Sequence, residues 1–368
     1  MFSFSINCAF LKSLFLLTFL TSSLFPSWAL GAFRPPKTLS GWNVFLEGKE
    51  GAWELHDSQI PYELNTPLFS DYANKYRTMF IPKGTKITLK NGQLTYPEGS
   101  FFTKTFFYNP ESIGKKEGLD GPWGENKYLI ETRVLFKTKR GWRGYPYRWD
   151  IKKNVARLSL LGEQISLTYN QKESFTYTIP NKNQCISCHA NYVDFGREIR
   201  PIGARRADNL LRRHPFLDGE GAKDQLSFLK EKGFLDESEE LSSLKPLPVW
   251  NSSQSGDLKS RAKAYLEVNC AHCHGQKGIA QSTGLILEYE NTKKTSSGIC
   301  KAPVAAGRGS GGLKYAISPG HPDESIIVLR MDSVETDVMM PELGRSLVHK
   351  EGVELISNFI FAMTGRCE

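Results

Sequence analysis

Two copies of one short pattern constrain this chain more than any other feature. Residues 185–189 read Cys-Ile-Ser-Cys-His, and residues 270–274 read Cys-Ala-His-Cys-His. The chain has only seven cysteines and seven histidines among its 368 residues, so two copies of this pattern are not a chance event. The two segments are therefore expected to be two sites with the same chemistry.

The spacing within the pattern indicates what that chemistry is. Two thiols three residues apart on a helical turn can form thioethers with the two vinyl groups of one haem, and the histidine that follows can place a ring nitrogen on the iron. We therefore expect two covalently attached haem c groups, with one histidine of each motif as an iron ligand. The residues expected to hold them are Cys185, Cys188 and His189 for the first haem, and Cys270, Cys273 and His274 for the second.

Two other uses of paired cysteines fit the pattern less well. A structural zinc site made from all four cysteines would separate its ligand pairs by about eighty residues, unlike a zinc ribbon, and would leave both histidines without a role. A thioredoxin-like redox pair would need a strand–helix–strand setting, and it does not require a histidine after the second cysteine. Haem is the interpretation that uses all six side chains.

The first thirty residues predict export. Only one of them is charged, and an apolar run at 14–25 is followed by small residues. Ser27 and Ala29 suit the −3 and −1 positions of a signal-peptidase site, so a signal peptide over residues 1–29, cleaved after Ala29 or Gly31, is expected. An uncleaved anchor is the alternative, although the run is short for a membrane span. The mature protein is expected to be periplasmic, with no stable membrane span.

Two cysteines remain outside the motifs once Cys8, which lies in the expected signal peptide, is set aside. They are Cys300 and Cys367. An even remainder in an oxidising compartment predicts a disulfide between them, with two free thiols as the alternative.

The charge balance gives no reason to expect nucleic-acid binding. The formal net charge of +8 is a mild excess for this length, and no lysine tract or nucleic-acid motif accompanies it. Arginines are densest between residues 197 and 213. There they can neutralise haem propionates, face an acidic partner, or form a solvated helix face. The segment GRGSGG at 307–312 lacks the end of a phosphate loop and is expected to be a turn.

The hydrophobic patterns predict an α+β chain of several domains. Residues 40–182 hold β-branched and aromatic runs separated by Gly, Pro and Asn, which favour an antiparallel β-sandwich-like domain. Residues 183–245 are expected to form a helical segment around the first haem. After a Pro- and Ser-rich linker at 244–256, a helix leading into the second motif and an amphipathic last helix predict a cytochrome c domain over 257–368.

A haem iron in an electron carrier usually has a second axial ligand, Met or His. For the second haem we expect Met340, a thioether just before a proline in a polar loop, with Met339 as the alternative. For the first haem the sequence offers His214, Met79 or His56, or an open position. Nothing in the sequence decides among these four.

Several motifs together resemble a family of predicted bacterial dihaem c-type cytochromes with a β-rich N-terminal region. They are TPLFSDYANKYR, KTFFY, IETRVLF, GWRGYPYRWD, NQCISCH, PIGARRADNL, NCAHCHG, KAPVAAGRGSGGLKYAISPGHPDESIIVLRM and MPELGRSLVHKEGVELI. The resemblance runs from about residue 40 to the C-terminus. It implies haem binding and electron transfer, carries the distal-ligand role onto Met340, and includes cysteines matching Cys300 and Cys367. It implies no particular substrate.

These features predict an exported dihaem c-type cytochrome that transfers electrons between redox partners, such as a dehydrogenase, a quinol oxidase or another cytochrome. One alternative is a peroxidase-like dihaem enzyme whose first iron is open on its distal side. Another is that the β-rich domain binds a polymer, such as a polysaccharide, through its aromatic residues. Those aromatics, Trp123, Trp142, Tyr145 and Trp149 among them, also suit a protein core.

Overall fold

The computed structural model describes residues 33–193, 196–212, 224–236, 241–305 and 307–368. The expected signal peptide and His214 lie outside these residues. The described residues from Pro35 onward belong to one compact unit, which contains both the β-rich part and the helical part. Within the described residues, no helix is long and apolar enough to cross a membrane.

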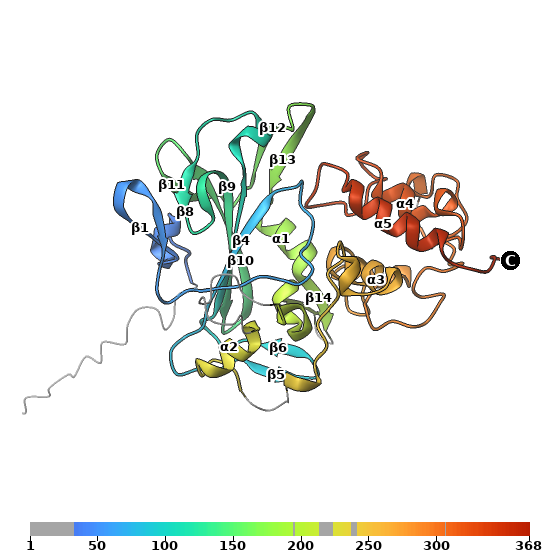
Figure 1. Ribbon diagram of the computed structural model, residues 1–368, viewed down its shortest axis with the longest axis horizontal. Coiled ribbons are helices and arrows are strands. Elements are labelled where there is room, and N and C mark those ends of the chain that lie inside the picture. Colours follow the sequence, from blue (N-terminus) through green and yellow to red (C-terminus); the bar gives the residue numbers. More distant parts are fainter. Residues whose placement is uncertain (1–32, 194–195, 213–223, 237–240, 306) are drawn as a thin grey trace, which may run out of the picture. The chain divides into compact units, whose positions relative to one another are not determined.

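A seven-stranded antiparallel sheet is the centre of the β-rich part (Figure 1). Six strands pair in the order β11–β10–β9–β7–β4–β3, and β8 pairs with β9. The strands are β3 (Ile60–Pro61), β4 (Asn74–Phe80), β7 (Phe101–Tyr108), β8 (Leu119–Gly121), β9 (Gly124–Thr138), β10 (Gly141–Asp150) and β11 (Val155–Leu158). This sheet confirms the antiparallel β-rich region expected from the sequence.

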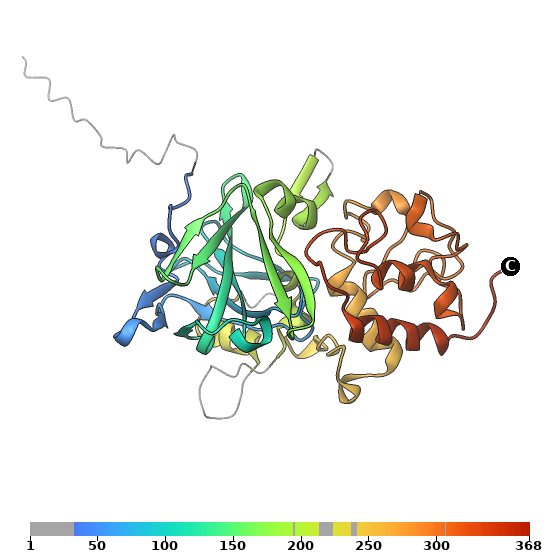
Figure 2. The same cartoon turned by 90° about the horizontal axis from the view of Figure 1, so that it is seen from above.

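Four two-stranded sheets complete the described strands. They are β1 (Phe45–Glu47) with β2 (Trp53–Leu55), β5 (Thr88–Lys90) with β6 (Gln93–Thr95), β12 (Glu163–Tyr169) with β13 (Glu173–Ile179), and β14 (Ala190–Val193) with β15 (Gly196–Ile199). Asn91 and Gly92 connect β5 to β6 with φ values of 51° and 70°, the left-handed backbone that a tight two-residue hairpin needs. Figure 2 shows the strands of this part from above.

Aromatic side chains fill the core of the β-rich part. The hairpin β12–β13 packs on the main sheet through Phe175 and Tyr177, which contact the cluster around Phe106 of β7. The four aromatics considered above as a polymer platform, Trp123, Trp142, Tyr145 and Trp149, are between 1% and 6% exposed. They belong to the core, where each buried aromatic stabilises the fold by roughly 1.5–3 kcal/mol, and they are not available to a polymer at the surface.

Five α-helices follow the main sheet in the described chain. They are α1 (Lys182–His189), α2 (Gln225–Glu231), α3 (Leu258–Asn269), α4 (Ile326–Met331) and α5 (Lys350–Phe361). Short 3-10 helices occur at Leu39–Trp42, Lys49–Gly51, Pro110–Ile113, Gly203–Arg205, Ala207–Leu210, Leu241–Ser243, Ser253–Ser255, Gln281–Thr283, Gly307–Ser310 and Pro322–Glu324.

Helices α3 and α5 pack together in the C-terminal part. The apolar side of α5, with Ile356 and Ile360 fully buried, shares a core with Ala262 and Leu266 of α3. The Asp257 carboxylate begins α3 by accepting a hydrogen bond from the Ser260 amide (2.7 Å). The expected cysteine pair is present, because the sulfur atoms of Cys300 and Cys367 lie 2.08 Å apart and form a disulfide.

Buried polar contacts join the β-rich part to the helical part. The Asp71 carboxylate accepts hydrogen bonds from the amides of Ser346 (2.6 Å) and Leu347 (2.8 Å). The Phe69 amide donates to the side chain of Asn269, the last residue of α3 (2.9 Å). Since unpaired buried amides are costly, these bonds fix the loop before α5 and the end of α3 against the segment that leads into β4. Both motifs lie close to this junction.

Candidate functional site

The first motif begins on a well-capped helix. The side chain of Asn181 accepts hydrogen bonds from the amides of Asn183 (3.0 Å) and Gln184 (2.9 Å), and the Gln184 side chain accepts one from the Asn181 amide (2.9 Å). This capping box fixes where α1 begins. Cys185 and Cys188, three residues apart, are therefore held on one side of the helix.

His189 is the last residue of α1, and its ring is oriented by a backbone carbonyl. The Nδ1 atom lies 2.7 Å from the carbonyl oxygen of Arg200, which the β14–β15 hairpin brings back beside the helix. Burial lowers the pKa of His189 to about 4, against the raising effect of that hydrogen bond, with Lys104 and Arg133 lowering it further. The imidazole is therefore neutral, with Nδ1 donating and Nε2 available, which is the usual arrangement of a metal-ligating histidine.

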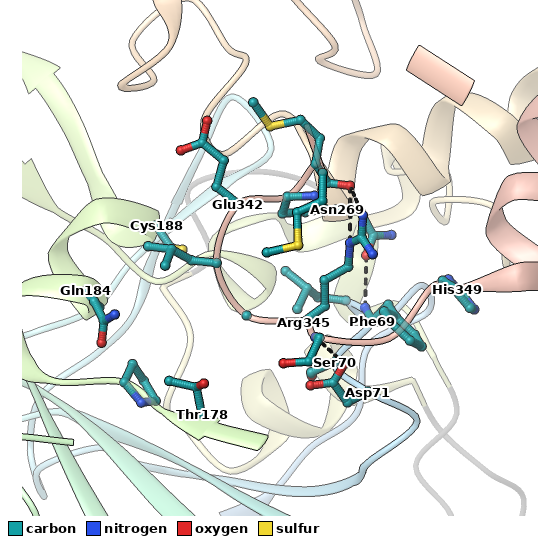
Figure 3. A pocket seen from close by; sticks show the side chains of 18 of the residues that line it. Phe69, Ser70, Asp71, Thr178, Gln184, Cys188, Asn269, Glu342, Arg345 and His349 are labelled. Carbon is teal, nitrogen blue, oxygen red and sulfur yellow. Dashed lines mark hydrogen bonds between the residues drawn. The ribbon is translucent and has the colours of Figure 1, made fainter. Parts of the chain in front are cut away.

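A cavity of about 460 Å³ opens beside α1. Cys185, Cys188 and His189 all line it, together with side chains of β7, β9 and β13 and of the loop before α5. Figure 3 places Gln184 and Cys188 on one side of this first cavity and His349 on the other. Neither thiol is in a disulfide, and burial raises the pKa of both. A complete Cys-Cys-His set therefore faces one cavity of ligand size.

The sheet gives the first cavity a positively charged wall. Lys104 of β7 and Arg133 of β9 are direct cross-strand neighbours, and both line the cavity. Arg133 donates to the Glu131 carboxylate (2.9 Å), whereas Lys104 makes no ion pair with a described residue. Burial lowers the pKa of Lys104 to about 7, and Arg133 lowers it further. Like charges opposite one another on a sheet are unfavourable, so this wall favours an anionic group inside the cavity.

The second motif lies in a turn directly after α3. The helix ends at Asn269, and the amides of Cys273 (3.1 Å) and His274 (2.8 Å) then bond to the Cys270 carbonyl. A second cavity of about 310 Å³ is lined by both thiols and by His274. Burial lowers the pKa of His274, with Arg330 adding to the lowering and the Leu285 backbone opposing it. The Nδ1 atom of His274 is buried without a hydrogen bond of ordinary geometry among the described residues.

The structure brings the expected Met340 to the second cavity. Its backbone is held on both sides, because its amide donates to the Arg330 carbonyl (2.8 Å) and its carbonyl accepts from the Arg345 guanidinium (2.9 Å). Met340 lines the first cavity as well, whereas Met339 lines only the first. His274 and Met340 thus share the second cavity.

The two cavities are adjacent, because they share wall residues. Cys188, Cys270 and His272 line both. The Cys273 thiol lies 4.0 Å from the Ser187 carbonyl, so the two motifs approach each other directly. Groups bound in the two cavities would therefore lie side by side.

Two of the residues considered for the far side of the expected first haem, Met79 and His56, do not reach the first cavity, and His214 lies outside the described residues. Met79 is 1% exposed within the aromatic core, and His56 is bonded through Nδ1 to the Ser58 hydroxyl (2.8 Å). Neither lines either cavity. His272, which was not expected from the sequence as a site residue, lines both. The signal for it was the extra histidine inside the second motif, Cys-Ala-His-Cys-His.

The arginine-rich segment is largely engaged in ion pairs. Arg206 contacts Asp208 and Glu290, each at 2.6 Å, and Glu267 at 3.4 Å. Arg200 contacts Glu198 at 2.9 Å. These partners tie the segment to the helical part and reduce its capacity to bind a further anion.

Among the residues that the structure describes, no three or more histidine, cysteine, aspartate or glutamate side chains converge as ligands for a metal ion. A haem iron takes four of its ligands from the porphyrin, so this finding does not bear on haem. Protein-family models, curated proteins and solved structures yielded no significant match to the chain.

Proposed function

We propose that this protein is an exported dihaem c-type cytochrome that transfers electrons between periplasmic redox partners. The observation that carries the proposal is the pair of adjacent cavities, each lined by the two thiols and the histidine of one motif. Their volumes, about 460 and 310 Å³, suit bound cofactors that leave an edge exposed. A c-type haem supplies reversible one-electron redox chemistry when it is bound in such a site.

Each residue of the two sets has a stated role in this proposal. Cys185 and Cys188 anchor the first haem, and Cys270 and Cys273 anchor the second. His189 and His274 would bind the irons of the first and second haem, and Met340 would also bind the second iron. The soft thioether of Met340 favours the reduced iron and raises its potential. These roles agree with the unpaired thiols and with the neutral ring of His189.

The adjacency of the cavities favours a carrier, because neighbouring redox groups within one chain can exchange electrons directly. The partners would be a dehydrogenase, a quinol oxidase or another cytochrome. Export, through the signal peptide proposed for residues 1–29, places the chain where covalent haem attachment is completed in bacteria.

A peroxidase-like dihaem enzyme is the second candidate, and the Lys104–Arg133 wall favours it. Lys104 and Arg133 would supply positive charge on the wall of the first cavity, where such an enzyme would bind peroxide. Such an enzyme would have a high-spin first haem that reacts rapidly with peroxide. Two low-spin haems without that reaction would leave the carrier as the function.

Replacement of Met340 tests the assignment at the second haem. Met340→Ala should abolish the methionine–iron charge-transfer band and lower the potential of one haem, leaving the other unchanged. Met339→Ala is the matched control. Met339 directly precedes Met340 in the same loop, but of the two cavities it lines only the first. A spectrum that is unchanged in Met340→Ala, or altered equally in Met339→Ala, would refute the assignment.

A further inference from the structure

Met79 and His56, two of the residues proposed from the sequence for the far side of the first haem iron, do not line the first cavity. The first cavity does contain a candidate from the other motif. His272 lies between Ala271 and Cys273, and its side chain lines both the first and the second cavity. It also lines a small cavity of about 40 Å³, which it shares with His189 and Arg200. No other histidine of the described chain lines all three cavities.

The ring of His272 has an unused polar atom. Its Nδ1 is buried and makes no hydrogen bond with any described residue. Buried polar atoms in native proteins are almost always paired, so an orphaned imidazole nitrogen indicates a partner that is not part of the polypeptide. Because His189 lines the same cavity, the iron of a haem held there would be such a partner.

The other histidine on the wall of the first cavity is already engaged. The Nδ1 atom of His349 lies 2.9 Å from the Tyr265 hydroxyl, and its Nε2 lies 3.7 Å from the Glu351 carboxylate. The ring also stacks on Phe69 with centroids 4.1 Å apart. Breaking these contacts would cost several interactions at once, whereas recruiting His272 breaks none.

We propose that His272 is the second axial ligand of the first haem iron, opposite His189. This inference rests on the proposed function, because it requires a haem at the first motif. It also has a consequence for electron transfer. His272 and the haem-anchoring Cys273 are joined by one peptide bond, so the first iron would be connected to the second haem through a short covalent path. One segment of the chain would thus serve both haems.

The test uses the mature holoprotein with both haems attached. Wild-type ferric protein should show two low-spin haems by electron paramagnetic resonance and absorption spectroscopy. His272→Ala should convert one of the two to high spin, halving the low-spin signal, and added imidazole should restore it. Met339→Ala is the control, because Met339 also lines the first cavity and its loss should not change the spin state.

A second variant covers the case in which His272→Ala does not mature. His272→Met keeps a ligating side chain and should produce a second methionine–iron band together with a raised potential at one haem. Low-spin spectra that are unchanged in the His272 variants would overturn the inference. A high-spin haem in the wild type would overturn it in favour of an open site, and conversion to high spin by Met339→Ala would overturn it in favour of Met339.

Haem counting separates this inference from the proposed function. If the wild type and the His272 variants all carry two haems per chain but their spin states do not differ in the expected way, His272 is not the ligand. The dihaem assignment then stands. If the wild type carries no haem, the proposed function itself fails.

Discussion

The ion cluster around Arg206 allows a quantitative test of how the two parts of the chain are held together. The side chains of Arg206 and Glu267 are 8% and 5% exposed, and their charged atoms lie 3.4 Å apart. Arg206 comes from the segment after the first motif, and Glu267 lies on α3, directly before the second. Replacing Arg206 by Met leaves the carboxylate of Glu267 buried without its closest cation.

The expected cost follows from burial. Removing one partner of a buried ion pair destabilises proteins by about 3–5 kcal/mol, because a charge remains in a poorly solvated place. Arg205, whose charged group lies 3.9 Å from that of Glu267, still neutralises part of the buried charge in the variant. We therefore expect a loss at the lower end of this range, about 3 kcal/mol. Losing the contact with Glu290 adds little to this cost, because the Glu290 side chain is 66% exposed. At 2–4 °C per kcal/mol, Arg206→Met should lower Tm by roughly 6 °C or more.

The pH dependence of this loss has a definite sign. Burial raises the pKa of Glu267, and Arg206 acts against that rise, so the pKa is higher still in Arg206→Met. A carboxyl group whose pKa is raised in the folded state is penalised while it is ionised, and the penalty disappears as the pH falls towards the pKa of the unfolded chain. The stability difference between wild type and Arg206→Met should therefore shrink between pH 7 and pH 5.

Urea unfolding of the holoprotein at both pH values measures these differences. Arg212→Met is the matched control, since Arg212 pairs with Glu63 at 3.1 Å but the two side chains are 46% and 30% exposed. That control should lose less than about 1 kcal/mol. Combining Arg206→Met with Glu267→Gln should recover most of the loss. Equal losses in Arg206→Met and Arg212→Met, or a loss that grows as the pH falls, would refute this reasoning.

Two further predictions concern the structure around the two motifs. Replacing Cys367 by Ser opens a disulfide that spans 67 residues, and loop entropy predicts a loss of about 4 kcal/mol, visible as a lower unfolding midpoint. A reductant should then destabilise the wild type but not the variant, and equal midpoints for the two oxidised proteins would contradict the estimate. Asn181→Ala removes the cap of α1 and should cost about 1 kcal/mol. Asn181→Asp should retain the stability in the same unfolding experiment, because its carboxylate can accept the same bonds.

The strands of the β-rich part could be located from the sequence, but their pairing could not. Alternating aromatic and β-branched residues, as in Phe101–Tyr108, indicate strands because side-chain direction alternates locally. The order β11–β10–β9–β7–β4–β3 depends on contacts between distant segments, for which the local pattern carries no signal. Likewise, α3 ends at Asn269 rather than continuing into the second motif, because the Cys270 carbonyl bonds into the following turn.

The same distinction between local and long-range information applies to the candidate site. The two motifs and Met340 were identified from the sequence, because short spacing and residue type alone indicate what they can bind. Met79 and His56 were considered by residue type, and only their burial in the core or distance from the cavities removes them. His272 was overlooked because its place between the two cavities depends on how the motifs meet, more than eighty positions apart in the chain.

The most direct test of the account is the number of haems bound per chain. The protein should be produced in bacteria that carry out c-type haem attachment and then analysed by intact mass and by pyridine haemochrome absorbance. The measured mass should equal that of the mature polypeptide plus two haem groups. Cys185→Ser/Cys188→Ser and Cys270→Ser/Cys273→Ser should each retain one haem. A mass equal to the polypeptide alone, or zinc bound by the four cysteines, would contradict it.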